Sequence, residues 1–342
     1  MSQAIAMPEP SNPPFARSRS LHNAAARLIS RCMMIACGLA ALCTIIALFM
    51  IFGYILYRGA SSINLALFTE LPGPPDADRP TGVRNAIAGT LVLIAMASCI
   101  GVPLGMLCGI YLAEYAKEGW FAHAIRLVVD VLSGVPSIIV GVLGYEMLVV
   151  SWTPLQNSSS SVANVFIFLI NKIIWLRMTL FPAGFSAWAG AIALGFMMCP
   201  IIARTSEEML KLVPKALREA STGLGASKFQ TLVRVVIPTA ASGIITGVML
   251  SVARVAGETA PLLFTVLGSN QEVFAHSDRF PYFMDLGHPF PALPLKIYEY
   301  QGSAESDWKR QAWAAMLILV VLVLVLNICV RVASNRKKFR AA

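Results

Sequence analysis

The chain has 342 residues, of which 57% are hydrophobic and only 13% are charged, whereas soluble domains carry about 25% charged residues. This composition excludes a soluble globular domain and predicts a membrane protein. The formal net charge of +9 does not indicate a nucleic-acid partner, because the basic residues gather next to the ends of apolar segments, where the positive-inside rule of membrane proteins places them.

Six apolar segments are long enough to cross a bilayer as α-helices, for which about 20 residues are needed. The first, residues 33–57, follows a proline-rich tail at 1–32, and its apolar run exceeds that of a signal peptide, so we expect a retained anchor helix. The others are residues 86–113, 127–150, 184–203, 239–267 and 311–333. The sequence therefore predicts an all-α membrane protein with six transmembrane helices.

Loop charges predict which side of the membrane each loop faces. The N-terminal tail holds four arginines against one acidic residue, which places it in the cytoplasm. Six crossings put the loop 204–238 and the C-terminal tail 334–342 on the same side, and both are basic. The loop 268–310, with six acidic and four basic residues, falls outside. We therefore expect both termini in the cytoplasm.

Residues 161–175, SVANVFIFLINKIIW, form a shorter apolar segment that Asn164, Asn171 and Lys172 interrupt. Its length of about 15 residues suits an interfacial helix better than a span. If it crossed the membrane, the basic loop 204–238 would face outward, which argues against a crossing.

Small residues recur at helical spacing in the second and third spans. In the second they fall at every fourth position and line one helix face, where another backbone can approach closely. They are Ala97, Gly101, Gly105, Gly109 and Ala113, followed in the third span by Gly134, Ser137, Gly141 and Gly144. We favour packing within one subunit over a dimer face. Pro136 lacks an N–H near the middle of the third span and should kink it.

The cytoplasmic loop is predicted to hold two short helices around a glycine turn. Pro214 suits the first turn of one helix, and Gly223 and Gly225 can end it. Ser227 and Gln230 have the spacing of a capping box for the second helix. Its apolar residues recur at i, i+3, i+4 and i+7, namely Phe229, Leu232, Val233 and Val236, before Pro238 opens the fifth span. Periodicity alone fits two interpretations: an amphipathic elbow that passes motion into the membrane, or a loop lying on the lipid surface.

The fifth span carries two charges. Arg254 and Glu258 are one helical turn apart near mid-membrane and continue a face formed by Gly243, Gly247 and Ser251. An intramembrane arginine costs about 2.5–3.5 kcal/mol on insertion scales and usually faces a cavity or pathway, although mutual neutralisation at a helix interface is the alternative. A guanidinium suits an anion such as phosphate or a carboxylate. Pro261 should loosen the helix nearby.

The loop resembles the EAA loop of binding-protein-dependent ABC importer permeases. Glu219, Ala220, Gly225 and Pro238 match that motif, while its second alanine, isoleucine and leucine are replaced by Ser221, Val235 and Ile237. In that family the loop is the coupling helix, which docks on the ATPase subunit. The resemblance implies this role for Pro214 to Val236 and favours the elbow.

A closer resemblance covers nearly everything from residue 82 onward. The chain is similar to PstA-type permeases of bacterial phosphate importers in the stretches NAIAGT (85–90), IGVPLG (100–105), GIYLAEY (109–115), DVLSGVPSIIVG (130–141), PIIARTSEEML (200–210), ARVAGETAPLLFT (253–265) and LPLKIY (293–298). The likeness departs at residues 153–181 and in the N-terminal tail. It implies a type I ABC importer permease domain over residues 82–333.

The resemblance further implies an inner-membrane heterodimer with a PstC-type sister permease, two ATP-binding subunits, a phosphate-binding protein outside and phosphate as substrate. Arg254 would contact the anion or gate it electrostatically, Glu258 would hold Arg254 in place when no anion is there, and Ser251 and Thr259 would line the same path. No catalytic residue, cofactor or metal site is expected, and the chain lacks the GxxxxGK[ST] loop of an ATPase.

Two other classes compete with this interpretation. An ion-coupled secondary anion transporter or a channel would also be helical and place charges in the membrane, but no inverted repeat of broken helices is recognisable. An enzyme is disfavoured because the four histidines are scattered and no Ser/His/Asp or metal cluster is evident.

Overall fold

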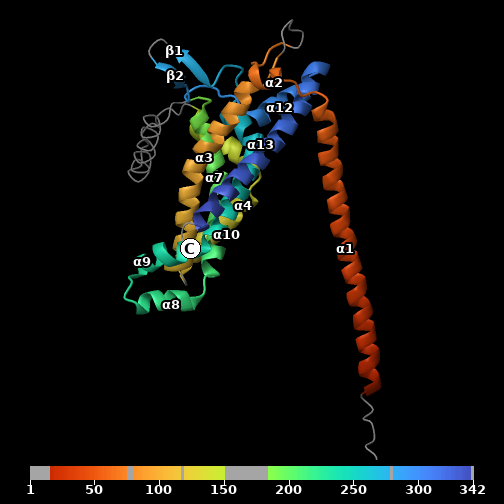
Figure 1. Ribbon diagram of the computed structural model, residues 1–342, viewed down its shortest axis with the longest axis vertical. Coiled ribbons are helices and arrows are strands. Elements are labelled where there is room, and N and C mark those ends of the chain that lie inside the picture. Colours follow the sequence, from red (N-terminus) through yellow and green to blue (C-terminus); the bar gives the residue numbers. More distant parts are fainter. Residues whose placement is uncertain (1–15, 75–80, 117–118, 151–183, 278–279, 340–342) are drawn as a thin grey trace, which may run out of the picture. The chain divides into compact units, whose positions relative to one another are not determined.

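The computed structural model describes the chain except residues 1–15, 75–80, 117–118, 151–183, 278–279 and 340–342 (Figure 1). The chain divides into two units, residues 1–57 and 58–342. The segment 161–175, expected as an interfacial helix, lies outside the described residues. The described part of the first unit belongs to α1 (Ala16–Ala60), which begins within the expected tail, includes the expected anchor helix and ends three residues into the second unit.

The second unit is almost entirely helical. Its longer helices are α3 (Arg84–Ile110), α4 (Trp120–Gly134), α7 (Ala187–Lys211), α10 (Ile237–Ala256) and α13 (Ser306–Phe339). Its shorter helices are α2 (Ala66–Thr69), α5 (Ser137–Gly144), α8 (Lys215–Gly223), α9 (Lys228–Thr231), α11 (Ala260–Thr265) and α12 (Leu293–Gly302). Three π-helical turns extend or join helices: η1 (Tyr111–Tyr115), η2 (Tyr145–Val149) and η3 (Leu232–Val236). A hairpin of β1 (Phe274–Ser277) and β2 (Phe280–Met284), which pairs Phe274 with Met284, was not anticipated.

Among the described residues, five helices are long and apolar enough to span a membrane, and a sixth span results if α4 and α5 are counted together. This pair is bent by 101°. Val135 and Pro136 are both extended, with ψ of 128° and 134°, as expected where proline disfavours the helical conformation of the residue before it. The expected kink at Pro136 is therefore a complete break, and the all-helical membrane fold is confirmed.

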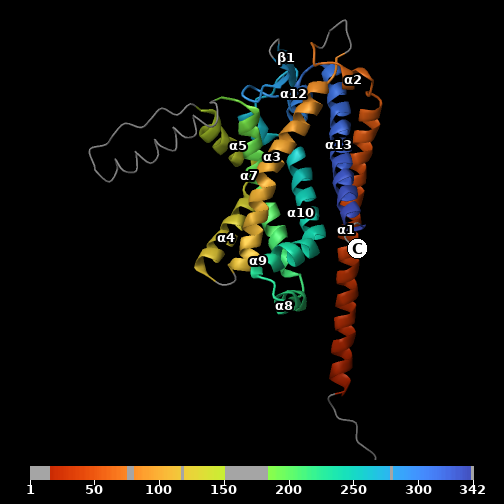
Figure 2. The same ribbon diagram turned by 60° about the vertical axis from the view of Figure 1, so that its left-hand side comes forward.

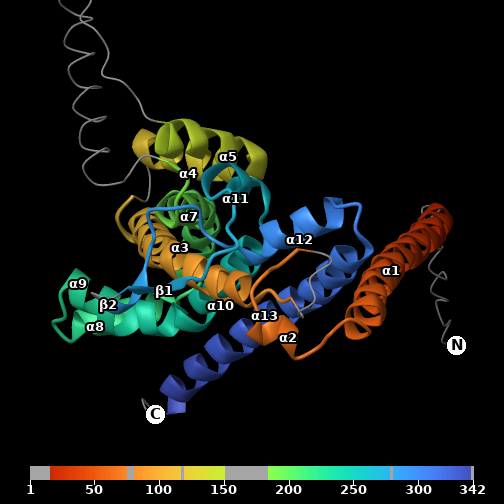
Figure 3. The ribbon, with the colours of Figure 1, turned by 90° about the horizontal axis from the view of Figure 1, so that it is seen from above.

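The small residues of α3 pack against α7 within this subunit, as expected (Figures 2 and 3). A Cβ added at Gly101 would lie 2.7 Å from the Gly195 carbonyl oxygen, and one at Gly105 would lie 2.7 Å from Ile202 Cβ. α10 packs on the same helix, because Gly243 and Gly247 face Met209 and Thr205. α7 is therefore the central helix of the unit.

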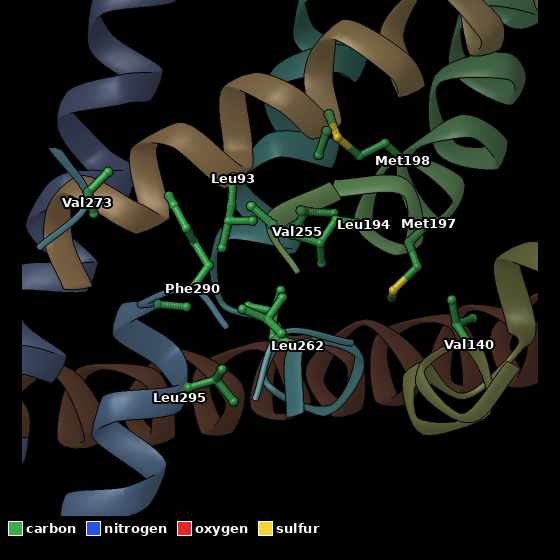
Figure 4. Close-up of a cluster of buried hydrophobic side chains, with 14 of the residues drawn as sticks. Leu93, Val140, Leu194, Met197, Met198, Val255, Leu262, Val273, Phe290 and Leu295 are labelled. Carbon is green, nitrogen blue, oxygen red and sulfur yellow. The ribbon is translucent and has the colours of Figure 1, made fainter. Parts of the chain in front are cut away.

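The main hydrophobic core surrounds α7 and joins it to α3, α5, α10 and α11 (Figure 4). Leu93 and Leu194 are each 1% exposed, and Val255 and Leu262 bring the end of α10 and the start of α11 into the same cluster. The two broken helices are thus anchored by one core. A second cluster joins α2, the start of α3, α12 and α13 at the end of the unit that carries the hairpin.

We expect Gly105→Leu to destabilise the protein. Overpacking a dense core costs about 1–3 kcal/mol, and here the added atoms meet the Cys199 carbonyl as well as Ile202. The yield of folded protein in detergent and its melting temperature should both fall. Gly134→Leu is the control, since a Cβ there meets nothing within 4 Å. Equal stability of the two variants would contradict the close α3–α7 contact.

Candidate functional site

The expected glycine-turn segment lies at the end of the second unit opposite the hairpin (Figures 1 and 2). We call residues 212–236 the elbow. Pro214 immediately precedes α8, and Gly225 adopts a left-handed conformation with φ of 84°. Ser227 Oγ accepts from the Gln230 N–H at 3.3 Å, and the Gln230 side chain accepts from the Ser227 N–H at 2.9 Å. The capping box and the glycine turn are confirmed.

One boundary of the elbow differs from expectation. α7 continues to Lys211, so the first eight residues of the expected loop are helical. The second elbow helix continues directly into the fifth span, since residues Lys228–Ala256 form one 29-residue helix, which agrees with an elbow rigidly joined to that span. The π-helical turn η3 ends at Val236, two residues before Pro238. Such a turn adds a residue to the helix and accommodates the missing N–H of proline without ending the helix.

The elbow presents apolar side chains to its surroundings. Of the four apolar residues with helical spacing, Leu232 and Val236 are buried, at 6% and 1% exposure, while Phe229 and Val233 are exposed. Leu217 and Leu224 of the elbow are also exposed, and Leu224 reaches 90%. Several large apolar residues exposed on one short segment are typical of a protein contact surface.

The motif residues are distributed over the elbow. Glu219 and Ala220 lie on the exposed surface of α8, and Gly225 forms the turn that follows. Pro238 is exposed at the start of α10, after η3. The structure thus gathers Glu219, Ala220 and Gly225 around one turn, whereas Pro238 belongs to the membrane helix.

Polar contacts that sequence reasoning missed fasten the elbow to the end of α3. Arg218 forms an ion pair with Glu114 of η1, and its guanidinium also donates to the Leu210 carbonyl at 2.7 Å. Lys228 donates to the Glu114 carbonyl at 3.0 Å and lies 4.5 Å from the centre of the Tyr115 ring. Glu114 is only 7% exposed. The sequence signal that could have revealed this contact is Glu114 itself, an acidic residue at the end of a long apolar span, in the stretch GIYLAEY.

We expect Gly225→Val to loosen the elbow turn, because a left-handed conformation costs a residue with a Cβ about 1–2 kcal/mol. Hydrogen exchange of α8 amides should become faster by about tenfold, since 1.4 kcal/mol corresponds to a factor of ten. Gly223→Val is the matched control, as Gly223 is helical and both positions have open space around the added Cβ. Unchanged exchange in Gly225→Val would contradict the strained turn.

The charged pair of the fifth span lies at the end of α10. The helix ends at Ala256, and the Glu258 N–H donates to the Val255 carbonyl at 3.1 Å. Arg254 Nε lies 3.5 Å from Glu258 Oε1, with side chains 45% and 17% exposed. The expected span 239–267 is interrupted at residues 257–259, close to Pro261, where the helix was expected to loosen. Pro261 is the second residue of α11 (Ala260–Thr265), where its missing N–H is tolerated because the first turn of a helix has no intrahelical partner for it.

Both helix breaks adjoin Arg254. A small cavity of about 10 Å³, which holds about one water molecule, is lined by Arg254, by Ser133 and Val135 at the break between α4 and α5, and by Met197 and Ile201 near the middle of α7. α5 also packs on α11, since a Cβ at Gly141 would lie 3.0 Å from the Ala260 carbonyl oxygen. The half-exposed guanidinium therefore reaches the surface beside two interrupted helices.

The two remaining candidates for the path are less accessible. Ser251 is fully buried in α10, and its hydroxyl donates to the Val248 carbonyl at 2.8 Å. Thr259 is partly buried at the start of α11, where its carbonyl accepts from the Leu263 N–H at 3.0 Å. Among the residues that the structure describes, no three His, Cys, Asp or Glu side chains could together hold a metal ion.

Comparison with known proteins gives three kinds of likeness. Residues 101–337 match the family described as binding-protein-dependent transport system inner membrane component. The chain is 39% identical over 281 residues to the phosphate transport system permease protein PstA of Yersinia pestis, covering 82% of this chain and 81% of that protein. It is 36% identical over 304 residues to the PstA protein of Haemophilus influenzae, covering 88% and 93%.

A solved structure shares the fold. The crystal structure of a bacterial alginate ABC transporter in complex with an alginate pentasaccharide-bound periplasmic protein aligns with a TM-score of 0.56 at 18% identity. The alignment covers 91% of this chain and 96% of the matched chain.

Proposed function

Because the chain belongs to the binding-protein-dependent transport system inner membrane component family, we propose that it is the permease subunit of an ATP-driven phosphate importer. The observation that carries this proposal is 36–39% identity to PstA proteins over most of both chains. The protein is a multi-pass membrane protein. It is a non-catalytic subunit, and ATP is hydrolysed by a separate protein, since the sequence has no GxxxxGK[ST] phosphate loop.

The elbow is the contact surface for the ATPase. Two ATP-binding subunits bind on the cytoplasmic side, one to this chain and one to a PstC-type sister permease, and a phosphate-binding protein delivers the anion outside. The exposed Leu217, Leu224 and Phe229 supply the apolar contact area. Both termini and the elbow face the cytoplasm, as the basic charge of the loop 204–238 favours. Membrane lipid surrounds the spans.

Motion passes from the ATPase to the membrane along one helix. ATP-driven closure of the two ATPase subunits displaces the elbow, and the 29-residue helix Lys228–Ala256, about 43 Å long at 1.5 Å per residue, carries this displacement to Arg254. The Arg218–Glu114 ion pair and the hydrogen bond from Lys228 to the Glu114 carbonyl keep the elbow from moving independently of the end of α3.

Arg254 is the anion contact of the translocation path. Its guanidinium is 45% exposed, and the cavity on its inner side has room for about one water molecule, so phosphate meets it from the exposed side. Glu258 neutralises Arg254 when no anion is bound, and the anion replaces this carboxylate at the guanidinium fork. Ser251 and Thr259 flank the pair and support the helix break.

Purification and reconstitution test this function. The tagged chain should copurify with an ATP-binding subunit and a second permease. In proteoliposomes with the binding protein outside and ATP inside, phosphate uptake should require ATP hydrolysis and survive an ionophore that collapses ion gradients. Uptake driven by an ion gradient in the absence of ATP would instead identify a secondary transporter.

A further inference from the structure

A second, larger cavity lies beside the elbow, between the ends of α3, α4 and α7. Its volume of about 630 Å³ falls within the range of small-molecule sites, about 300–1,000 Å³. Four basic and two acidic side chains line it: Arg126, Arg204, Lys211, Lys215, Glu207 and Glu208. The net positive lining favours an anionic ligand.

One wall of this cavity is fixed by a buried carboxylate. Glu207 is 2% exposed and accepts from Arg126 Nε at 2.8 Å and from Lys211 Nζ at 2.5 Å. Arg126 also donates to the Leu112 carbonyl at 3.1 Å, which ties α4 to the end of α3. Arg126 and Lys211 already donate hydrogen bonds to Glu207, so this wall contributes positive charge and a rigid frame and does not bind the anion directly.

Arg204 also lines the cavity, but its carboxylate partners are exposed, whereas Arg126 and Lys211 pair with the buried Glu207. Its Nε donates to Glu208 at 2.8 Å and its Nη1 to Asp130 at 3.1 Å, and all three side chains are about half exposed, at 48%, 53% and 55%. Exposed ion pairs are weak, so an arriving anion can displace either carboxylate from the guanidinium. Lys215 is exposed on the same cavity.

The position of Arg204 connects this cavity to Arg254. Ile201 of α7 and Ser133 of α4 line the small cavity around Arg254. Arg204 follows Ile201 by three residues and Asp130 precedes Ser133 by three residues, each about 4.5 Å along the helix axis. Arg204 therefore lies about one helical turn from that cavity, toward the elbow.

We propose that the cavity lined by Arg204 is a binding site for a tetrahedral oxyanion, at which phosphate that has left Arg254 is held before it enters the cytoplasm. This inference rests on the proposed function. The anion exchanges with Asp130 and Glu208 at the Arg204 guanidinium, whose planar fork matches two oxygens of phosphate. Lys215 and the cations around Glu207 attract the anion without binding it tightly.

The test measures binding of inorganic phosphate to the whole complex, without the binding protein and with the nucleotide sites filled by ADP. The readout is broadening of the phosphate ³¹P resonance. Arg204→Gln should lower the apparent affinity about tenfold, because it removes a charge-assisted hydrogen-bond donor. Asp130→Asn and Glu208→Gln should raise the affinity, because they release Arg204 from its partners. Arg310→Gln, which removes an exposed arginine with an acidic partner outside both the cavity and the elbow, is the matched control and should change nothing.

The opposite changes in phosphate affinity, a loss in Arg204→Gln and a gain in Asp130→Asn, distinguish an anion site from a structural ion pair. If Arg204 only holds α4 against α7, Asp130→Asn should fail to raise phosphate affinity, and this result overturns the inference. An unchanged affinity in Arg204→Gln, or an equal loss in Arg310→Gln, overturns it as well. ATP-driven uptake by the unaltered complex is measured in parallel, so failure of the proposed function is seen separately.

Discussion

Arg254→Gln is expected to abolish ATP-driven phosphate uptake while the complex remains assembled. A hydrogen bond to a charged group contributes about 1.5–3 kcal/mol, and each 1.4 kcal/mol corresponds to a factor of ten. The substitution removes the anion's guanidinium and leaves Glu258 as a net negative charge beside the path, which repels phosphate. Uptake should therefore fall at least about tenfold from the lost hydrogen bond alone, and to background once this repulsion is added. The measurement is the initial rate of radiolabelled phosphate uptake in proteoliposomes.

Two controls separate this transport role from a structural one. The Arg254→Gln complex should copurify with its partners in normal yield, because the arginine is half exposed and its loss leaves no cavity in the core. Arg310→Gln removes another exposed arginine with an acidic partner on its own helix and should leave uptake unchanged. Uptake by Arg254→Gln at the rate of the unaltered complex would remove Arg254 from the path.

Glu114→Gln is expected to uncouple ATP hydrolysis from transport. Arg218 and Glu114 are mostly buried, with side chains 24% and 9% exposed, and removing one member of a buried pair costs about 3–5 kcal/mol. The elbow then loses its main attachment to the end of α3, so the ATPase moves the elbow without moving the membrane helices together. Uptake per ATP hydrolysed should fall about tenfold or more, because each 1.4 kcal/mol lost from the ion pair makes the arrangement in which the elbow is attached to α3 about tenfold less favoured.

The ratio of phosphate transported to ATP hydrolysed is the measurement that distinguishes uncoupling from unfolding. The charge-exchanged double variant Glu114→Arg with Arg218→Glu restores opposite charges and should recover part of this ratio. A parallel loss of hydrolysis and uptake in Glu114→Gln, with the ratio unchanged, would indicate instead that the pair only stabilises the fold or the assembly.

Features with a local cause were predictable from the sequence. The small residues of α3 pack on α7, as their four-residue spacing implied, because that spacing alone decides which helix face permits close approach. The Ser227–Gln230 capping box formed because its two hydrogen bonds join residues three apart. Arg254 was conspicuous as a charge within an apolar segment, and its role in transport stays a prediction.

Features that depend on distant partners were not predictable. The pair of Glu114 and Arg218 joins residues 104 positions apart, and no periodicity reports such a contact. The fifth span was expected to cover residues 239–267 because apolar residues flank the GET stretch at 257–259 on both sides, and a complete separation of α10 from α11 was not anticipated. The break is accommodated by α5, which packs against α11 across Gly141 and supports a short helix that local propensity does not favour. The same packing turned the expected kink at Pro136 into a 101° bend.

A single crosslinking measurement tests whether the elbow is the point at which the ATPase drives this permease. A cysteine placed at Leu224, which is 90% exposed, should crosslink to the ATP-binding subunit in inverted membrane vesicles, with a yield that changes between nucleotide-free and ATP-bound states. The unaltered chain, with its own seven cysteines, provides the background. Labelling of Leu224→Cys by a membrane-impermeant thiol reagent added outside intact cells, with no crosslink to an ATPase, would contradict the account.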